Sequence, residues 1–315
     1  MQIGFLFPGQ GVQKVGMGKD LYEKYEEVKN VYDEVKKITG IDIKKISFEG
    51  PKELLNKTQN TQLAILTESL AILKVLKNKN IKAKMSSGLS LGEYTALIED
   101  KIFDFETGIK VVEKRGEIMQ KLTPKGNWKM AAIMGLREKQ VEEICKKMDN
   151  RYVVPANYNT KGQIVISGEE EAVVKAGELA KEMGAKKVSL LNTEGPFHTP
   201  KLEKCSIALK KELTKIKINK KDSKVVKNID GKTYMENDNI IEILSKHISN
   251  PVRFTSCLQT MYDNGIDTFV EIGPGRTLSS FVKRMKFENP IKIMNVSNCE
   301  ELETLIKEVK NLWIK

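Results

Sequence analysis

The sequence predicts an α/β protein with a parallel-sheet core and an inserted ferredoxin-like subdomain, and three observations lead to this class. Short apolar runs alternate with amphipathic helical patterns along most of the 315 residues. Two of these runs end in glycine-rich turns, at residues 8–11 and 273–275. Between about residues 126 and 191 the order becomes β-α-β-β-α-β, which is typical of the ferredoxin-like unit.

The core is expected to combine residues 1–125 with residues 192–315. Its apolar runs predict strands at 3–7, 81–86, 268–272 and 291–296. Helical spacing predicts a helix from residue 63 to about 76, with Asn60 or Thr61 as its cap. The other expected core helices cover 19–37, 91–98, 105–122, a segment led by Pro200, 240–247, 277–286 and 300–314. In the insert, residues 126–191, strands are expected at 129–134, 152–156, 163–167 and 187–191, and helices at 138–148 and 169–183.

The composition is that of a folded, basic protein. It is 40% apolar and 30% charged, so the chain can bury a sizeable core and is not expected to be disordered. The net charge is +11, and residues 201–227 alone carry ten lysines for a net of +7. Such a run usually forms a solvated face, but it also suits an acidic partner. No RNA-binding signature, zinc-finger spacing or arginine-rich arm is present, so we expect no nucleic-acid partner.

The four cysteines lie more than 40 residues apart. Without a CxxC pair they predict neither a metal site nor a thioredoxin-type motif, and we interpret them as reduced thiols of a cytoplasmic protein. The N-terminus lacks the basic region of a signal peptide. The apolar stretch 63–76 is interrupted by Glu68 and Lys74, which argues against a membrane span.

The segment from Gly88 to Gly92, with the sequence GLSLG, fits the G-x-S-x-G pattern of a nucleophile elbow. In that turn two glycines allow a sharp passage from strand to helix, and Ser90 lies at its apex. An expected strand before it and a helix after it favour this interpretation. Lys82 and Lys84 make the strand a poor one, however, so the pattern alone leaves a chance turn open.

The only two histidines are His198 and His247, so a base for Ser90 has few candidates. Thr199 and Pro200 are typical of the first positions of a helix. His198 would therefore precede a helix N-terminus, which disfavours the imidazolium form and keeps the ring neutral, as a general base requires. A capping or surface histidine fits the same pattern.

Arg115 is an unusual residue in the expected helix 105–122. On a helical wheel with Ile109 at 0°, the charged and polar residues of this helix share an arc of roughly 20–140°. Arg115 falls at roughly 240°, among apolar positions. A buried guanidinium needs a partner, and no carboxylate shares its arc. Either Arg115 forms a structural ion pair with another segment, or it binds a substrate carboxylate through two parallel hydrogen bonds.

Taken together, these motifs resemble the malonyl-CoA:acyl-carrier-protein transacylases, and the resemblance spans nearly the whole chain. The shared segments, in family order, are FPGQGVQ at 7–13, Thr61-Gln62, GLSLGEY at 88–94, Arg115, Asn157, His198, Asn250-Pro251-Val252 and Gly273-Pro274-Gly275. The resemblance implies an α/β hydrolase-like core with a ferredoxin-like insert, which agrees with the element order above.

The resemblance also implies a two-step transfer from malonyl-CoA to the phosphopantetheine thiol of acyl carrier protein. Ser90 would be the nucleophile and His198 its base, with a main-chain carbonyl holding the imidazole. Backbone N–H groups of Gln10 and Leu91 would form the oxyanion hole, and Arg115 would pair with the malonyl carboxylate. The further substrate-binding residues it implies are Asn157, Phe197 and His247. No metal or redox cofactor is expected.

Two positions depart from the family pattern. Leu89 stands where the family usually has histidine, and His247 stands where it commonly has glutamine. His247 is expected to hydrogen-bond in place of that glutamine. Three alternatives stay open: a transferase for another acyl group or a trans-acting polyketide system, a serine hydrolase or thioesterase, and a non-catalytic scaffold. Phe197 should crowd a methyl branch and so favours malonyl, and Arg115 argues against a lipase.

The acidic carrier protein is expected to dock on basic residues. We expect this site on the last strand of the insert and the helix after Gly273-Pro274-Gly275, at Lys186, Lys187, Lys283, Arg284 and Lys286. The lysine run at 201–227 is the competing candidate. No exposed apolar stripe calls for a second copy of the chain, so a monomer is expected.

Overall fold

The core sheet of the computed structural model has four parallel strands in the order β2-β1-β7-β8. The structure describes residues 1–148, 151–191, 193, 195–219 and 221–313. The strands are β1 (Ile3–Phe7), β2 (Met85–Gly88), β7 (Thr268–Ile272) and β8 (Lys292–Val296). All residues of β1, β2 and β7 are buried, as expected for parallel strands covered on both faces.

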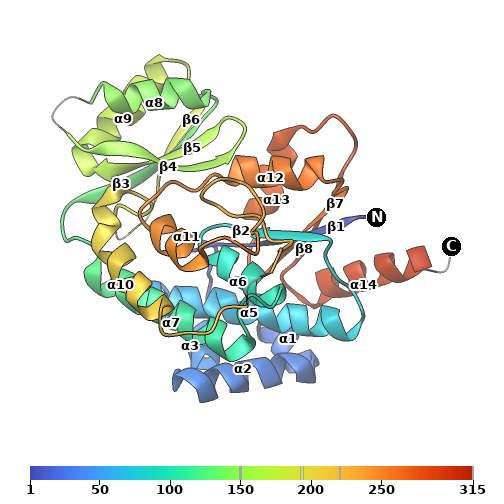
Figure 1. Cartoon of the computed structure of the whole chain (residues 1–315). Coiled ribbons are helices and arrows are strands. Elements are labelled where there is room, and N and C mark those ends of the chain that lie inside the picture. Colours follow the sequence, from blue (N-terminus) through green and yellow to red (C-terminus); the bar gives the residue numbers. More distant parts are fainter. Residues whose placement is uncertain (149–150, 192, 194, 220, 314–315) are drawn as a thin grey trace.

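Helices cover both faces of this sheet (Figure 1). Alternate residues of β1 and β7 enter two different cores: Phe5 and Val270 pack among helices of the N-terminal half, and Leu6 and Phe269 pack against α12 and α13. The helices before the insert are α1 (Lys19–Lys24), α2 (Glu26–Thr39), α3 (Ile43–Glu49), α4 (Lys52–Leu55), α5 (Thr58–Asn78), α6 (Leu91–Glu99) and α7 (Phe105–Leu122). Those after it are the 3-10 helix η1 (Pro200–Leu202), α10 (Glu203–Leu213), α11 (Ile240–His247), α12 (Phe254–Asp263), α13 (Thr277–Met285) and α14 (Cys299–Trp313).

The insert forms a separate antiparallel sheet at the upper left of Figure 1. Its elements are β3 (Trp128–Met134), α8 (Glu138–Lys146), β4 (Val153–Thr160), β5 (Gln163–Glu169), α9 (Glu170–Glu182) and β6 (Lys187–Leu191). The strand order β4-β5-β3-β6 is that of a ferredoxin-like unit, and α8 and α9 share a small core with the sheet. The predicted fold class, a parallel-sheet core with an antiparallel subdomain, is therefore confirmed.

Several predicted boundaries were wrong. β2 begins at Met85 rather than at residue 81, because Lys82 and Lys84 are exposed and Ile81 instead closes the end of α5, where its N–H bonds Leu76 O. Helix α5 begins at Thr58, so Asn60 and Thr61 lie within it rather than capping it. Helices α3, α4 and α12 were not predicted. Position 192, where the second core segment was expected to start, and Lys220 of the basic run lie outside the described residues.

Candidate active site

Ser90 lies on a tight turn between β2 and α6. Its φ of 54° is in the left-handed region, which is unusual for a residue other than glycine and is typical of a strained functional turn. A Cβ on Gly88 would lie 2.0 Å from Gly92 C, and one on Gly92 would lie 2.0 Å from Phe7 O. Only hydrogen therefore fits at either position, and the two glycines of the motif are required by close backbone packing.

The hydroxyl of Ser90 is paired with His198. Ser90 Oγ lies 2.7 Å from His198 Nε2, and His198 Nδ1 lies 3.1 Å from the backbone O of His247 and 3.2 Å from that of Asn250. Two carbonyl acceptors at Nδ1 place the ring proton there, which leaves Nε2 free to accept the serine proton. Burial, reinforced by the nearby cation of Arg115, lowers the pKa of His198 to about 4. The ring is therefore neutral at physiological pH, as a general base must be.

His198 precedes a helix in which Thr199 is the N-cap residue and Pro200 the first residue, as the sequence predicted, but the Thr199 side chain makes no capping hydrogen bond. Thr199 Oγ1 instead donates to Pro196 O at 2.8 Å, which fixes the turn before η1. His198 itself has a φ of 58°. Both members of the dyad thus occupy left-handed backbone positions set by their own turns.

Arg115 is 1% exposed, which confirms its predicted burial in α7. Its Nη1 donates to Gln62 Oε1 at 2.6 Å, and its Nη2 donates to Ser90 Oγ at 3.0 Å. The guanidinium also lies 5.1 Å from the ring centroid of Tyr94. Its partners within the described chain are therefore neutral, and its Nε has none. No carboxylate of the described chain hydrogen-bonds the cation, which Glu93 attracts only at longer range and which lies directly beside the serine hydroxyl.

A cleft of about 770 Å³ opens over Ser90, between the core and the insert. Of the residues predicted for the site, those that line it are Gln10, Ser90, Leu91, Arg115, Asn157, Phe197 and His198. A Cβ on Gly9 would lie 2.5 Å from Leu89 O, so this glycine lets the loop after β1 approach the elbow. Gln10 of this loop and Leu91, the first residue of α6, both line the cleft.

The position of His247 argues against the substrate contact predicted for it. It is 1% exposed and does not belong to the described lining of the cleft. Its Nδ1 lies 3.2 Å from Glu93 Oε2, and its ring lies 5.0 Å from that of His198. His247 belongs behind the dyad, because the last turn of α11 points its carbonyl group, not its ring, at His198 Nδ1.

Of the residues predicted for docking, Arg284 lines the cleft and Lys186 lies beside it. Arg284 Nη1 is 4.0 Å from Met134 Sδ, and the N–H of Lys186 bonds Met134 O at 2.8 Å. Lys187 follows in β6, while Lys283 and Lys286 lie near the end of α13 and are exposed. No ion pair involves any of the five within the described chain.

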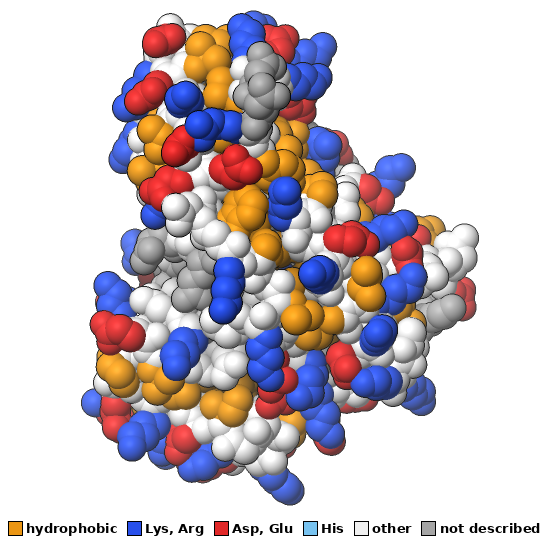
Figure 2. All heavy atoms as spheres, turned by 90° about the vertical axis from the view of Figure 1, so that its left-hand side faces the viewer, with side chains coloured by type: hydrophobic (Ala, Val, Ile, Leu, Met, Phe, Trp, Pro, Cys, Tyr) orange, Lys and Arg blue, Asp and Glu red, His pale blue; other side chains and the backbone are white. Residues whose placement is uncertain are grey.

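In the lysine run at 201–227, four of the nine described lysines pair with neighbouring acids. Its paired lysines are Lys210 with Glu242, Lys215 with Glu212, Lys221 with Asp100, and Lys227 with Asp230 and Asp238. Figure 2, which faces the left-hand side of Figure 1, shows basic and acidic side chains interspersed over that face. The run is therefore a mixed surface rather than one strongly basic patch.

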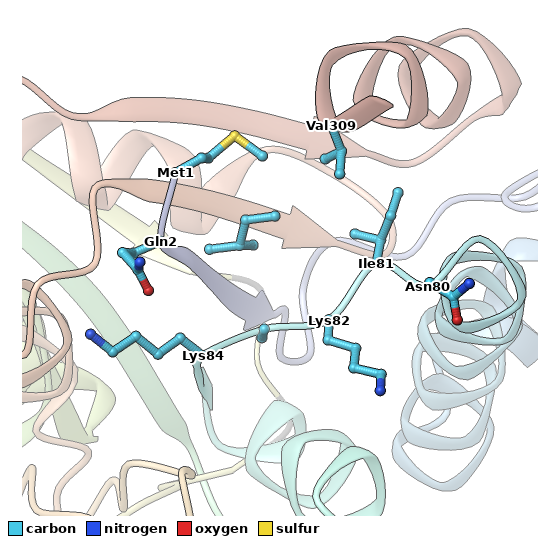
Figure 3. Close-up of a pocket in the computed structure, with 9 residues that line it drawn as sticks. Met1, Gln2, Asn80, Ile81, Lys82, Lys84 and Val309 are labelled. Atoms are coloured by element: carbon cyan, nitrogen blue, oxygen red, sulfur yellow. The ribbon is translucent and has the colours of Figure 1, made fainter. Parts of the chain in front are cut away.

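A second cavity, of about 390 Å³, lies at the far edge of the core sheet. The side chains that line it come from three places: the start of the chain, the segment that follows α5, and helix α14 (Figure 3). The terminal amine of Met1 is near Asp267, and Lys84 donates to Asn264 O, so these cations already have partners. In the described chain no cluster of three or more His, Cys, Asp or Glu could hold a metal, and no described helix has the length and apolarity to cross a membrane.

Sequence reasoning assigned no role to three residues around the dyad. The amide of Gln62 orients Arg115, Asn228 Oδ1 accepts from Ser90 N at 2.7 Å, and Asn228 Nδ2 donates to Gly88 O at 2.7 Å. Glu93 is buried behind the elbow. A charge within the apolar stretch 91–98 was a usable signal for Glu93. Asn228 gave no local signal, because it reaches Ser90 across 138 positions of sequence.

Comparisons with known proteins agree with this geometry. An acyl transferase domain model matches residues 4–314. The chain is 38% identical over 311 residues to the malonyl CoA-acyl carrier protein transacylase of Bacillus subtilis, covering 98% of each chain. It is also 38% identical over 286 residues to the protein of the same name from Escherichia coli K12, covering 90% of this chain and 93% of that one.

Solved structures that resemble this chain have similar names. The malonyl CoA-acyl carrier protein transacylase of Clostridium perfringens superposes with a TM-score of 0.94 at 42% identity, covering 100% of this chain and 99% of that one. A malonyl-transacylase in complex with a type II PKS acyl-carrier protein superposes with a TM-score of 0.92 at 34% identity, covering 98% and 100%. The resemblance seen in the motifs is confirmed, and the chain belongs to the acyl transferase family.

Proposed function

We propose that this protein transfers a malonyl group from malonyl-CoA to the phosphopantetheine thiol of acyl carrier protein through a malonyl-serine intermediate. One observation carries the proposal: Ser90 Oγ lies between a neutral base, His198, and a buried cation, Arg115. The base suits acyl transfer and the cation suits an acyl group that ends in a carboxylate. The names of the relatives agree with this substrate and acceptor.

In the first half-reaction, Ser90 Oγ attacks the thioester carbon of malonyl-CoA while His198 Nε2 takes the hydroxyl proton. The oxyanion develops where the backbone N–H groups of Gln10 and Leu91 are proposed to donate. The C–S bond then breaks, and the coenzyme A sulfur takes the proton from His198. Leu91 begins α6, so the positive end of that helix dipole faces the same oxygen.

Arg115 is proposed to select the acyl group. In the free protein one N–H donates to Ser90 Oγ. A malonyl carboxylate would attract that donor and pair with the planar guanidinium in two parallel hydrogen bonds. Gln62 would keep the Arg115 guanidinium oriented both before and after the substrate binds. Asn157 and Phe197 line the cleft beside it, where Phe197 would crowd a methyl-branched acyl group.

In the second half-reaction, His198 takes the proton of the phosphopantetheine thiol, and the sulfur attacks the malonyl ester. Ser90 Oγ leaves and recovers its proton. We propose that the carrier protein docks at the cleft rim formed by Lys186, Lys187, Lys283, Arg284 and Lys286. The core, residues 1–125 and 192–315, would carry the dyad and the insert, residues 126–191, part of the rim. We expect no metal or redox cofactor, a monomer and a cytoplasmic location.

Mass spectrometry of the intact protein after incubation with malonyl-CoA tests the proposal. The expected result is a malonyl adduct on Ser90 that is discharged by holo-acyl carrier protein and not by water. Ser90→Ala should form no adduct while unfolding at the same urea concentration. An adduct that water removes as fast as the carrier protein does would identify a hydrolase.

A second acceptor class deserves a direct comparison, because one of the similar structures is a complex with a type II PKS acyl-carrier protein. Fatty-acid and polyketide carrier proteins should therefore be offered in parallel to the malonylated enzyme. Preferential discharge by a fatty-acid carrier places the protein in fatty-acid synthesis, and preferential discharge by a polyketide carrier supports the trans-acting alternative.

A further inference from the structure

Glu93 is a buried carboxyl group that no step of the transfer uses. It lies on α6, three residues after Ser90, and its side chain is 1% exposed. Burying a carboxyl group is costly unless donors compensate it, so its partners indicate why it is there. Two groups donate to it, Tyr234 OH at 2.5 Å from Oε1 and Asn228 N at 3.3 Å from Oε2, and His247 Nδ1 lies 3.2 Å from Oε2.

Two of these partners lead to opposite halves of the dyad. Asn228, whose N–H bonds Glu93, also holds the elbow through its side chain, with Oδ1 accepting from Ser90 N and Nδ2 donating to Gly88 O, each at 2.7 Å. His247, whose Nδ1 lies 3.2 Å from Glu93 Oε2, accepts from His198 Nδ1 at 3.1 Å through its backbone carbonyl. One carboxyl group therefore connects the nucleophile's turn to the base's acceptor.

We infer that Glu93 is the positioning residue that sets the distance and orientation of Ser90 relative to His198, through Asn228 on one side and the imidazole of His247 on the other. The inference rests on the proposed function only in taking Ser90 and His198 as the reacting pair. It also gives His247 a role: where the resemblance leads one to expect glutamine, an imidazole N–H supplies the donor to Glu93. Because burial raises the pKa of Glu93 to about 7, the carboxyl group is mainly ionised at pH 8, where its oxygens can accept from Tyr234, Asn228 and His247.

Glu93→Met tests the carboxyl group, since methionine has similar length and offers no acceptor of comparable strength. At pH 8 we expect the single-turnover rate of Ser90 malonylation to fall by about 10²-fold, the usual cost of misplacing reacting groups by about 1 Å, while KM for malonyl-CoA changes less than about threefold. Glu68→Met is the matched control. Glu68 is equally buried, and no partner for either of its carboxyl oxygens exists in the described chain.

A pair of His247 variants tests the same link if Glu93→Met does not fold. His247→Gln keeps a side-chain donor and the backbone carbonyl, so its rate should stay within about threefold of wild type. His247→Leu keeps only the carbonyl, so it should be slowed by at least about tenfold. Urea denaturation identifies the variants that are folded under assay conditions.

The second readout is the rate at which a fluorophosphonate labels Ser90. In that reaction Ser90 Oγ bonds phosphorus, fluoride leaves and the proton passes to His198, so the rate reports the dyad without malonyl-CoA. If wild type takes the label but no malonyl group, the proposed function fails and this inference is still tested. The inference is overturned if folded Glu93→Met and His247→Leu are labelled and malonylated at the same rates as wild type. The inference is also overturned if Glu68→Met loses as much rate as Glu93→Met. It is overturned as well if His247→Gln and His247→Leu lose the same rate.

Discussion

Arg115 occupies a position where a cation is costly, and its hydrogen-bond partners in the described chain, Gln62 and the Ser90 hydroxyl, are both neutral. In Arg115→Ala we expect kcat/KM for malonyl-CoA to fall on the order of 10²-fold or more, since two charge-assisted hydrogen bonds to the carboxylate are lost. Activity toward acetyl-CoA should rise relative to malonyl-CoA, because no buried cation is left unpaired beside the acetyl group. Arg115→Lys should also be impaired, since an ammonium cannot make the planar two-point contact. An unchanged malonyl-to-acetyl ratio in Arg115→Ala would make the arginine purely structural.

The same cation acts on His198. Burial is the main reason why the pKa of His198 is lowered from 6.5 to about 4, and Arg115 adds to it. Protonation removes the base, so the labelling rate of Ser90 should fall as the pH drops through the pKa of His198. Removing the cation in Arg115→Ala stabilises the imidazolium and raises that pKa. The acid limb of the fluorophosphonate labelling profile should therefore lie at higher pH in Arg115→Ala than in wild type, and an unmoved or lower limb would contradict this account.

Individual residues differed in how well the sequence predicted them. Arg115 stood out because helical periodicity alone places it in the apolar arc. His247 was misjudged because its partner, Glu93, lies 154 positions earlier in the chain and meets it only in the folded core. Asn228 was not predicted either, because its partner Ser90 is also distant in the sequence. Local patterns therefore find residues that violate their own element, and they miss residues whose partners come from other elements.

The turn joining β2 to α6 requires glycine because neighbouring backbone atoms leave no room for a side chain. A Cβ on Gly92 would lie 2.0 Å from Phe7 O, a backbone atom that cannot move without shifting β1. Gly92→Ala should therefore lower the free energy of unfolding by about 1–3 kcal/mol, the range for overpacked positions, and slow malonylation of Ser90 as well. Gly177→Ala, in helix α9, is the matched control. Its Cβ would meet only the side chain of Val188, at 3.1 Å, so urea denaturation should give a change within about 1 kcal/mol of wild type.

Elements with strong periodicity were predicted well. Helix α7 spans Phe105–Leu122, as expected from its charged and apolar arcs, and strands β1, β6 and β7 have their predicted bounds. Helix α12 was missed, although its residues Phe254, Cys257, Leu258 and Met261 are buried in a helical pattern. The i, i+3, i+4, i+7 spacing of these four residues was a usable signal for a helix. The order of the strands in the core sheet could not come from the sequence, since it depends on pairing across almost the whole chain.

At the scale of the whole molecule, the excess positive charge predicts electrostatic docking of an acidic carrier protein. Lys187 pairs with the cleft-lining Met134 and Lys283 precedes the cleft-lining Arg284; both lysines are exposed and neither is among the described lining residues. Arg284 itself lines the cleft, so reversing it would also affect malonyl-CoA. We therefore expect Lys187→Glu combined with Lys283→Glu to raise KM for the carrier protein and weaken its salt dependence, with malonylation of Ser90 nearly unchanged. Lys204→Glu combined with Lys211→Glu, on the exposed side of α10, removes the same charge from the competing run. If this control raises KM for the carrier protein more than the rim variant does, docking takes place on α10 and the proposed rim is wrong.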